Sequence, residues 1–186
     1  EGGRPSVDAK SPDIRIQARL HKGQVAVSLD ISGESLHRRG YRTGQGSAPL
    51  KENLACAILL RSGWPAIAKQ GGALIDPMCG SGTILIEAAL MAADIAPALN
   101  RETFGFTHWL KHDEPLWETV LADAEQRKTQ GLENFDLDIR GYDGNSRVLD
   151  VTVANIENAG LDEHIRIAHK PLDQFGKATA ETGLLV

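Results

Sequence analysis

The segment from residue 73 to residue 96 constrains the fold of this chain more than any other part of the sequence. It begins with ALID (73–76), continues through PMCGSGT (77–83) and runs into the stretch ILIEAALMAADIA (84–96). A short apolar run before a glycine-rich turn predicts a buried strand, and the long apolar stretch after the turn predicts a helix. A strand, a glycine loop and a helix in this order form the first unit of a parallel α/β sheet.

A second unit of the same kind follows. IRGYD (139–143) predicts a strand, Asn145 can cap the next helix, and Gly160 can end that helix. Two further strands are expected, at 165–168 and at 183–186. Strands that alternate with helices imply an α/β fold with a doubly wound, mostly parallel sheet.

Residues 95–136 separate the two units and are longer than an ordinary connection between a helix and a strand. We interpret them as an insertion that contains a polar helix over 114–130. Aromatic residues of this insertion could stack on nucleic-acid bases. Aromatic residues in a short insertion more often pack it onto the core, and we prefer that interpretation for Phe104, Phe106, Trp109 and Trp117.

The N-terminal part of the chain has a different pattern. Apolar and polar residues alternate over 14–20 and again over 25–31, with HKG (21–23) between the two runs. Alternation with a period of two predicts strands with one buried face, and the intervening glycine predicts a turn. We therefore expect a β-hairpin.

A connector rich in glycine, serine and arginine follows the hairpin. It predicts a boundary near Gly44, which would separate an N-terminal piece, 1–43, from a main domain, 44–186. The main domain is expected to open with an amphipathic helix that is capped by Ser47 and stopped by Gly63.

Composition excludes several classes of protein. The chain has 186 residues, is 41% hydrophobic and 24% charged, and contains no apolar run long enough for a membrane span, so we expect a globular protein with no membrane role. Its net charge of -5 gives no general attraction to phosphate backbones, so a nucleic-acid contact requires a local basic patch. The two cysteines lack disulfide or metal-site spacing, which favours reduced thiols, a cytoplasmic location and no metal. Because the chain starts at Glu1 without a signal peptide, it is expected to be part of a longer protein.

The glycine loop and two acids predict a cofactor site. Gly80 and Gly82 allow the backbone to approach a ligand and direct N–H groups at its polar atoms. Asp76, at the end of the first strand, can accept hydrogen bonds from the loop or from a cationic amine. Asp143, at the end of the second strand, stands where doubly wound nucleotide binders hold the two ribose hydroxyls.

Two other interpretations of these residues remain. Asp143 could simply be an acid that stabilises the N-terminus of a helix. A nicotinamide-dependent oxidoreductase is disfavoured, because the third glycine of the dinucleotide fingerprint is missing and the ribose acid lies far from the loop in sequence.

The chain also resembles a known family. DPMCGSGT (76–83) followed by IEAA, with GYDGNSRVLDVTVANIENAGL (141–161), resembles the THUMP-containing RNA methyltransferases, and within them the bacterial guanine-N2 methyltransferases of 23S ribosomal RNA, often labelled N6-adenine-specific DNA methylases. The resemblance extends through LDISGESLHRRGYR (29–42) and APLKENLACAILLRSGW (48–64). It implies a class I methyltransferase that uses S-adenosylmethionine (SAM) and has a Rossmann-like fold, here truncated after the fourth strand. It also implies that 1–43 is the tail of the THUMP region with its linker.

The resemblance implies specific roles for residues. Asp76 and the glycine loop would surround the methionine part of SAM, Asp143 would bind its ribose, and Asp173, displaced by about two residues from the family's position, would contact the adenine amine. The full set of implied cofactor-binding residues is Asp76, Met78, Cys79, Gly80, Ser81, Gly82, Asp143, Gly144 and Asp173.

The resemblance places the catalytic motif outside this chain. In the family the fourth strand leads into Asn-Pro-Pro-Tyr, which holds the target amine and stacks on the flipped base, and that motif is expected just after Val186. No catalytic residue is therefore assigned in this chain, and the chain alone is not expected to turn over. The intact protein would transfer the methyl group directly to a guanine N2 amine, with neither a metal nor a nucleophilic Cys79.

RNA is the expected partner, and a basic stretch in the linker is the candidate contact. Arg38, Arg39 and Arg42 could bind a phosphate backbone, although they could equally belong to a solvated linker. DNA adenine methylation and a noncatalytic RNA-binding module with a relic methyltransferase fold are the alternatives to guanine methylation.

Overall fold

A computed structural model describes residues 6–10, 12–42, 49–175 and 180–186 of the chain. The elements described are β1 (Arg15–His21), β2 (Gln24–Asp30), α1 (Glu52–Arg61), α2 (Trp64–Lys69), β3 (Ala73–Asp76), α3 (Thr83–Ala92), the 3-10 helix η1 (Gly105–His108), α4 (Glu114–Glu133), β4 (Ile139–Asp143), α5 (Ser146–Asn158), β5 (Ile165–His169), the 3-10 helix η2 (Leu172–Gln174) and β6 (Gly183–Leu185).

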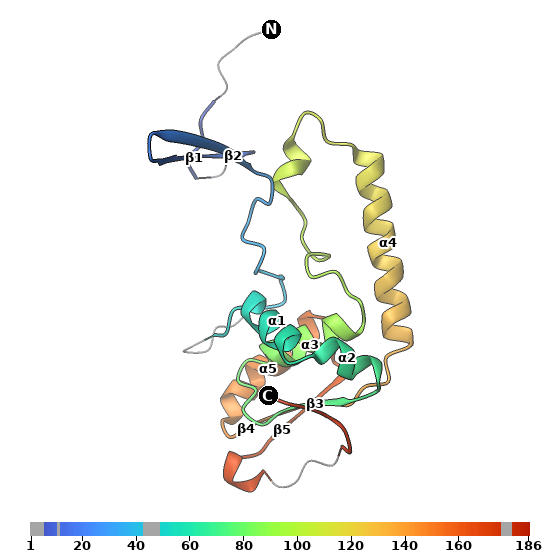
Figure 1. Ribbon diagram of the computed structural model, residues 1–186. Helices are drawn as coiled ribbons and strands as arrows, with labels where there is room; N and C mark the ends of the chain where they lie inside the picture. The colour runs from blue at the N-terminus through green and yellow to red at the C-terminus, as the bar shows by residue number, and fades with distance from the viewer. Residues whose placement is uncertain (1–5, 11, 43–48, 176–179) are drawn as a thin grey trace.

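A four-stranded parallel sheet with the order β5-β4-β3-β6 organises the main part of the molecule (Figure 1). The register pairs Asp76 of β3 with Gly141 of β4, and Asp143 of β4 with His169 of β5. Helix α3 follows β3 and contacts the sheet, the chain returns to β4 through η1 and α4, and α5 connects β4 to β5 and contacts both of those strands. The predicted α/β fold, its four strands and its glycine loop are confirmed.

The hydrophobic core lies between this sheet and the helices. Every residue of the short strand β3 is buried, as its continuous apolar sequence indicates for a central strand of a parallel sheet. The fully buried side chains include Leu59 of α1, Leu74 of β3 and Leu85 of α3. Burying each such side chain contributes about 1.5–3 kcal/mol relative to its exposed state.

Helix α2 was not expected from the sequence. Gly63 ends α1 as predicted, but with φ of 77° it also stands at the N-cap of α2, and Pro65 occupies the first turn. Trp64 is fully buried and donates its indole N–H to the carbonyl of Ala88 at 2.9 Å, which fixes α2 on α3. The proposed cap Ser47 and the proposed boundary near Gly44 lie outside the described residues.

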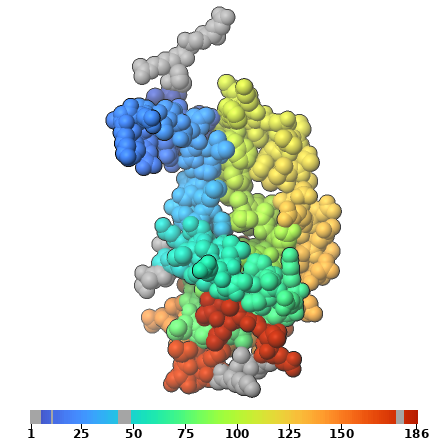
Figure 2. All heavy atoms as spheres, in the orientation of Figure 1, coloured from blue at the N-terminus to red at the C-terminus, as the bar shows by residue number. Residues whose placement is uncertain are grey.

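The N-terminal hairpin is confirmed, but its predicted buried face is wrong. Strands β1 and β2 pair in antiparallel fashion, with Ile16 opposite Leu29 and Leu20 opposite Val25. The large apolar side chains of both strands are 51–73% exposed. The hairpin stands away from the sheet domain (Figures 1 and 2), so the alternating pattern reflects a face that no part of the described chain covers.

The insertion rises from the sheet domain to the end of the hairpin, and α4 leads back from there toward the sheet (Figure 1). Phe104 and Phe106 stack with ring centroids 5.1 Å apart, and Trp117 meets both rings edge-on. The backbone N–H of Phe106 donates to the carbonyl of Ile31 at 3.1 Å. The expected packing of these aromatic residues onto the main core is therefore wrong, because they form a separate cluster beside the end of β2.

Close packing at Gly141 should make the fold sensitive to one methyl group. A Cβ at this position would lie 2.3 Å from a Leu85 methyl carbon and 3.1 Å from the Cys79 sulfur. We expect Gly141→Ala to lower the free energy of unfolding by about 1–3 kcal/mol through overpacking. Urea unfolding measures the change. Gly144→Ala is the control, because its added Cβ would come no closer than 3.4 Å to Pro171, and equal stability of the two variants would contradict the prediction.

Candidate functional site

Two acidic residues stand at the same edge of the sheet. Asp76 ends β3 and Asp143 ends the neighbouring strand β4. Because both strands run in the same direction, their carboxyl ends lie side by side, and the loops that follow them form the crevice where open α/β sheets bind ligands. The structure thus brings together the two acids that the sequence predicted.

The glycine loop between β3 and α3 uses its two glycines differently. Gly80 and Gly82 both have positive φ, of 53° and 79°, a region that L side chains rarely adopt. A Cβ on Gly82 would lie 2.8 Å from a methyl carbon of Thr152, so Gly82 allows close packing under the loop. A Cβ on Gly80 would meet no heavy atom within 4 Å. The space beside Gly80 is therefore open to a ligand.

The Asp143 carboxylate ties the two strand ends together. One oxygen accepts the backbone N–H of Gly80 at 3.0 Å, and the other accepts that of Asn145 at 2.9 Å. The N–H of Cys79 also donates to the carbonyl of Tyr142, at 2.8 Å. A carboxylate has about four lone-pair positions, so Asp143 can hold the loop and still accept hydrogen bonds from a ligand.

Asp76 is a buried acid with a perturbed pKa. Only 6% of the residue is exposed, and its carboxylate accepts the backbone N–H of Met78 at 3.0 Å. The pKa of Asp76 is raised to about 6, mainly by burial; the Met78 hydrogen bond lowers it in part, and the negative charge of Asp143 adds a smaller increase. A cationic ligand would relieve the penalty on the ionised form, which makes Asp76 a suitable partner for an ammonium group.

Cys79 is a packing residue of the loop. Its side chain is buried, and burial together with the charges of Asp76 and Asp143 raises the pKa of its thiol to about 12. The thiolate, which is the nucleophilic form, is therefore suppressed at neutral pH. Met78 beside it is 65% exposed and stands on the outer side of the loop.

The remaining predicted cofactor residues follow β4 and β5. Gly144 comes directly after Asp143, and its carbonyl lies 3.0 Å from a ring nitrogen of His169. Asp173 is exposed in η2, two residues after Pro171, and Pro171 lies beside Gly144. The segment that carries Asp173 is thus next to the β4 end of the site.

Two residues that position the loop were missed in the sequence. Asn155 of α5 donates its side-chain N–H to the carbonyl of Ser81 at 3.0 Å, and the hydroxyl of Thr152 donates to the carbonyl of Gly80. Both side chains are fully buried. The available signal was two polar residues three positions apart within an otherwise amphipathic helix, which places them on one face.

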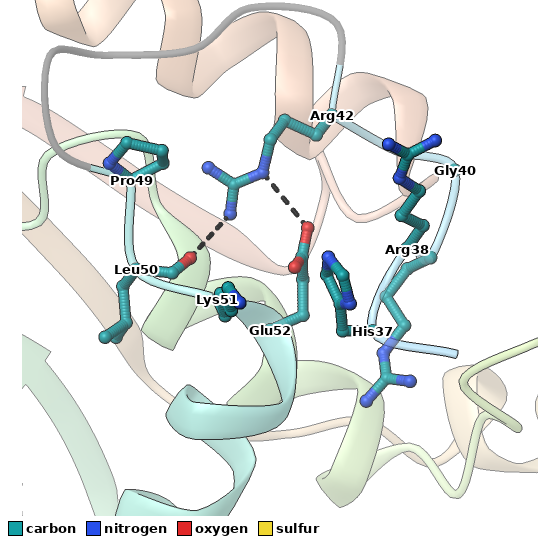
Figure 3. A pocket seen from close by; sticks show the side chains of 9 residues that line it. His37, Arg38, Gly40, Arg42, Pro49, Leu50, Lys51 and Glu52 are labelled. Carbon is teal, nitrogen blue, oxygen red and sulfur yellow. Dashed lines mark hydrogen bonds and ion pairs between the residues drawn. The ribbon is translucent and has the colours of Figure 1, made fainter. Parts of the chain in front are cut away.

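The three arginines of the predicted RNA contact line one pocket with His37, Lys51 and Glu52. Figure 3 shows Arg38 and Arg42 in this pocket. The three arginine side chains have different surroundings. That of Arg38 is 71% exposed and pairs with the equally exposed Glu34, whereas Arg39 and Arg42 are 11% and 12% exposed. Arg39 and Arg42 pair with the buried carboxylates of Glu87 and Glu52, so their guanidinium groups are directed into the protein.

The described residues contain no group of three or more His, Cys, Asp or Glu side chains that could hold a metal ion. Across the same part of the chain, no helix has both the length and the apolar character that spanning a membrane requires.

Comparison with known proteins points to one family. The family described as "RMKL-like, methyltransferase domain" matches residues 39–186. Ribosomal RNA large subunit methyltransferase K/L of Cellvibrio japonicus is 55% identical over 179 residues, which are 96% of this chain and 24% of that protein. The protein of the same name from Pseudomonas aeruginosa is 52% identical over 187 residues, which are 100% of this chain and 26% of that protein. The chain therefore spans about a quarter of the length of these relatives.

Solved structures agree with this comparison. The crystal structure of SMU.472, assigned as a methyltransferase and complexed with SAH, has a TM-score of 0.82 and 37% identity and covers 95% of this chain and 44% of its own. A structure from Listeria monocytogenes, described as a predicted N6-adenine-specific DNA methylase, has a TM-score of 0.81 and 35% identity and covers 92% of this chain and 43% of its own.

Asp76 should make stability depend on pH. Its ordinary pKa is 3.8 and its folded-state pKa is about 6, so the folded state binds more protons between these values and the free energy of unfolding falls as pH rises through this window. The loss should be on the order of 2–3 kcal/mol. Urea unfolding of the wild type and of Asp76→Asn between about pH 4 and about pH 7 isolates this contribution. The exposed Asp173→Asn is the control, and parallel profiles for the wild type and Asp76→Asn would contradict the prediction.

Proposed function

We propose that this chain, which belongs to the family of RMKL-like methyltransferase domains, binds SAM at the carboxyl ends of β3 and β4. One observation carries the proposal. The Asp143 carboxylate holds the glycine loop against the end of β4 while the space beside Gly80 stays open. An acid, a glycine loop and an open backbone at adjacent strand ends form a nucleotide site of the doubly wound type.

The chemistry of the donor set fits SAM. Asp76 offers a buried carboxylate to the ammonium of the methionine part, beside loop residues Cys79 to Gly82. Asp143 offers acceptors to the ribose hydroxyls, and Gly144 and Asp173 stand on the adenine side. SAM bound here would supply an electrophilic methyl group. The residues of this chain bind and orient the cofactor, and the reacting amine would be held by residues outside this chain.

The substrate we propose for the whole protein is a guanine N2 amine in 23S ribosomal RNA. Relatives named for large-subunit ribosomal RNA methylation are 52–57% identical to this chain, whereas the structural relative described as a DNA methylase is 35% identical. Greater identity to the RNA methyltransferases supports RNA over DNA. In the same proposal, 1–43 is the tail of an RNA-binding THUMP region with its linker, and 44–186 is the first half of the methyltransferase domain.

Among the three linker arginines, Arg38 is the one we propose to contact RNA. Its guanidinium is exposed, and its ion pair with Glu34 is a surface pair that stabilises the fold little. An exposed guanidinium of this kind can exchange its carboxylate partner for an RNA phosphate at a small cost in free energy.

Calorimetric titration with S-adenosylhomocysteine (SAH) tests the cofactor proposal. The wild-type chain should bind SAH, and Asp143→Ala should lower the affinity at least about tenfold, because a charged hydrogen-bond partner is lost. Asp150→Ala is the matched control, since Asp150 is exposed on α5 and should leave binding unchanged. Binding of NAD in place of SAH, or equal affinities of Asp143→Ala and the wild type, would overturn the proposal.

Salt dependence tests the proposed RNA contact. Arg38→Ala should reduce the slope of the logarithm of RNA affinity against the logarithm of salt concentration by about one. Fluorescence anisotropy with a single-stranded RNA measures the slope. Arg61→Ala, at the exposed end of α1, serves as the control, and an unchanged slope for Arg38→Ala would exclude the contact.

A further inference from the structure

The linker that precedes the main domain lies along one face of α3. The Tyr41 hydroxyl donates to the Glu87 carboxylate at 3.0 Å, and Arg39 lies 3.4 Å from the same oxygen. Arg42 donates to the Thr83 hydroxyl at 2.8 Å. Thr83 and Glu87 are four residues apart and so share a helix face. The linker therefore follows this face back to the start of α3, where the glycine loop ends.

Arg42 is the residue at which the linker reaches the loop. Its Nε donates to the Glu52 carboxylate at 3.0 Å, and one terminal nitrogen donates to the carbonyl of Leu50 at 2.9 Å (Figure 3). The other terminal nitrogen lies 3.4 Å from the Ser81 hydroxyl. Together with its bond to Thr83, these contacts make the Arg42 side chain a link between the linker, the start of α1, the glycine loop and the start of α3.

We propose that Arg42 is a positioning residue for the cofactor loop rather than an RNA contact. This inference rests on the proposed function. The loop contains two glycines with positive φ, whose backbone is not restricted by a side chain. Its conformation must therefore be set by external partners. Asp143 holds Gly80 from β4 and Asn155 holds the Ser81 carbonyl from α5. Arg42 contacts the hydroxyls of Ser81 and Thr83 from the linker.

Burial explains why Arg42 can hold this position. Its side chain is 12% exposed and that of Glu52 is 7% exposed. Charged hydrogen bonds that are shielded from water are stronger and more directional than those at the surface. Removing the guanidinium would leave the buried Glu52 carboxylate without the positive charge that now pairs with it. Because a buried unpaired charge is unfavourable, we expect the start of α1 and the glycine loop to shift.

Arg39 provides a matched comparison. It belongs to the same linker, is equally buried at 11% exposed, and pairs with a buried glutamate of α3. Its partner Glu87 lies one helical turn beyond Thr83, away from the loop. Changes at Arg39 and Arg42 should therefore loosen the linker similarly, while only a change at Arg42 reaches the loop.

Calorimetric titration of the whole chain with SAH and with 5′-methylthioadenosine separates positioning from general stability. Arg42→Gln should lower SAH affinity about tenfold, since it removes charged hydrogen bonds that order the loop. It should change methylthioadenosine affinity little, because this ligand lacks the amino-acid part that the loop surrounds. Arg39→Gln should lower the thermal unfolding midpoint as Arg42→Gln does and leave SAH affinity unchanged.

The isosteric variant Thr83→Val tests the same bond from the loop side and does not depend on whether Arg42→Gln folds. By itself it should weaken SAH binding. Where Arg42→Gln folds, combining the two substitutions should add no further loss. Equal loss in Arg39→Gln and Arg42→Gln, equal loss for both ligands, or additive effects of Arg42→Gln and Thr83→Val would overturn the positioning role. Failure of the wild-type chain to bind SAH would instead overturn the proposed function, and this inference with it.

Discussion

The bond from the Gly80 backbone to the Asp143 carboxylate is the contact on which the rest of the site depends. It crosses from the loop after β3 to the end of β4, and the same carboxylate caps the turn into α5 through Asn145. Asp143 thereby links the end of β4 to the loop that follows β3 and to the turn that precedes α5. The parallel register, which pairs Asp76 with Gly141, makes this geometry available, because it places Asp143 beyond the end of β3. The absence of a side chain at Gly141 allows Cys79 and Leu85 to pack against β4 directly.

The same arrangement selects the charge of the ligand. Asp76 and Asp143 concentrate two carboxylates at one edge of the sheet, and their mutual repulsion contributes to the raised pKa of Asp76. Two adjacent carboxylates repel a pyrophosphate, whereas they attract a ligand that carries an ammonium and a sulfonium group. The missing third glycine of the dinucleotide fingerprint and the electrostatics of the site therefore disfavour a nicotinamide cofactor for independent reasons.

The fold was predictable where the signal is local, and the site was predictable only in part. Strand β3, the glycine loop and Asp143 follow from apolar runs, glycines and strand ends, which need only neighbouring residues. The orientation of Arg42 and the support from Asn155 depend on partners 39 and 74 residues away in sequence. Composition marks Arg42 as basic but does not specify whether phosphate or a buried carboxylate neutralises it. For the same reason, the alternation in the hairpin identified its strands but not what covers their apolar face.

The placement of the hairpin relative to the cofactor site follows from polar contacts along the linker rather than from apolar packing of the hairpin itself. At its upper end, Arg101 donates to the carbonyls of Ser32 and Glu34 at 3.1 and 2.9 Å, and the insertion adds the bond between Phe106 and Ile31. Residues 39–42 are held on α3 at the lower end. Hydrogen bonds thus hold the linker at both ends, and because they are directional they restrict its orientation more than non-directional apolar contacts would. Segment 95–136, whose Arg101 and Phe106 supply the bonds at one end, therefore connects the N-terminal hairpin to the rest of the chain without pairing with the sheet.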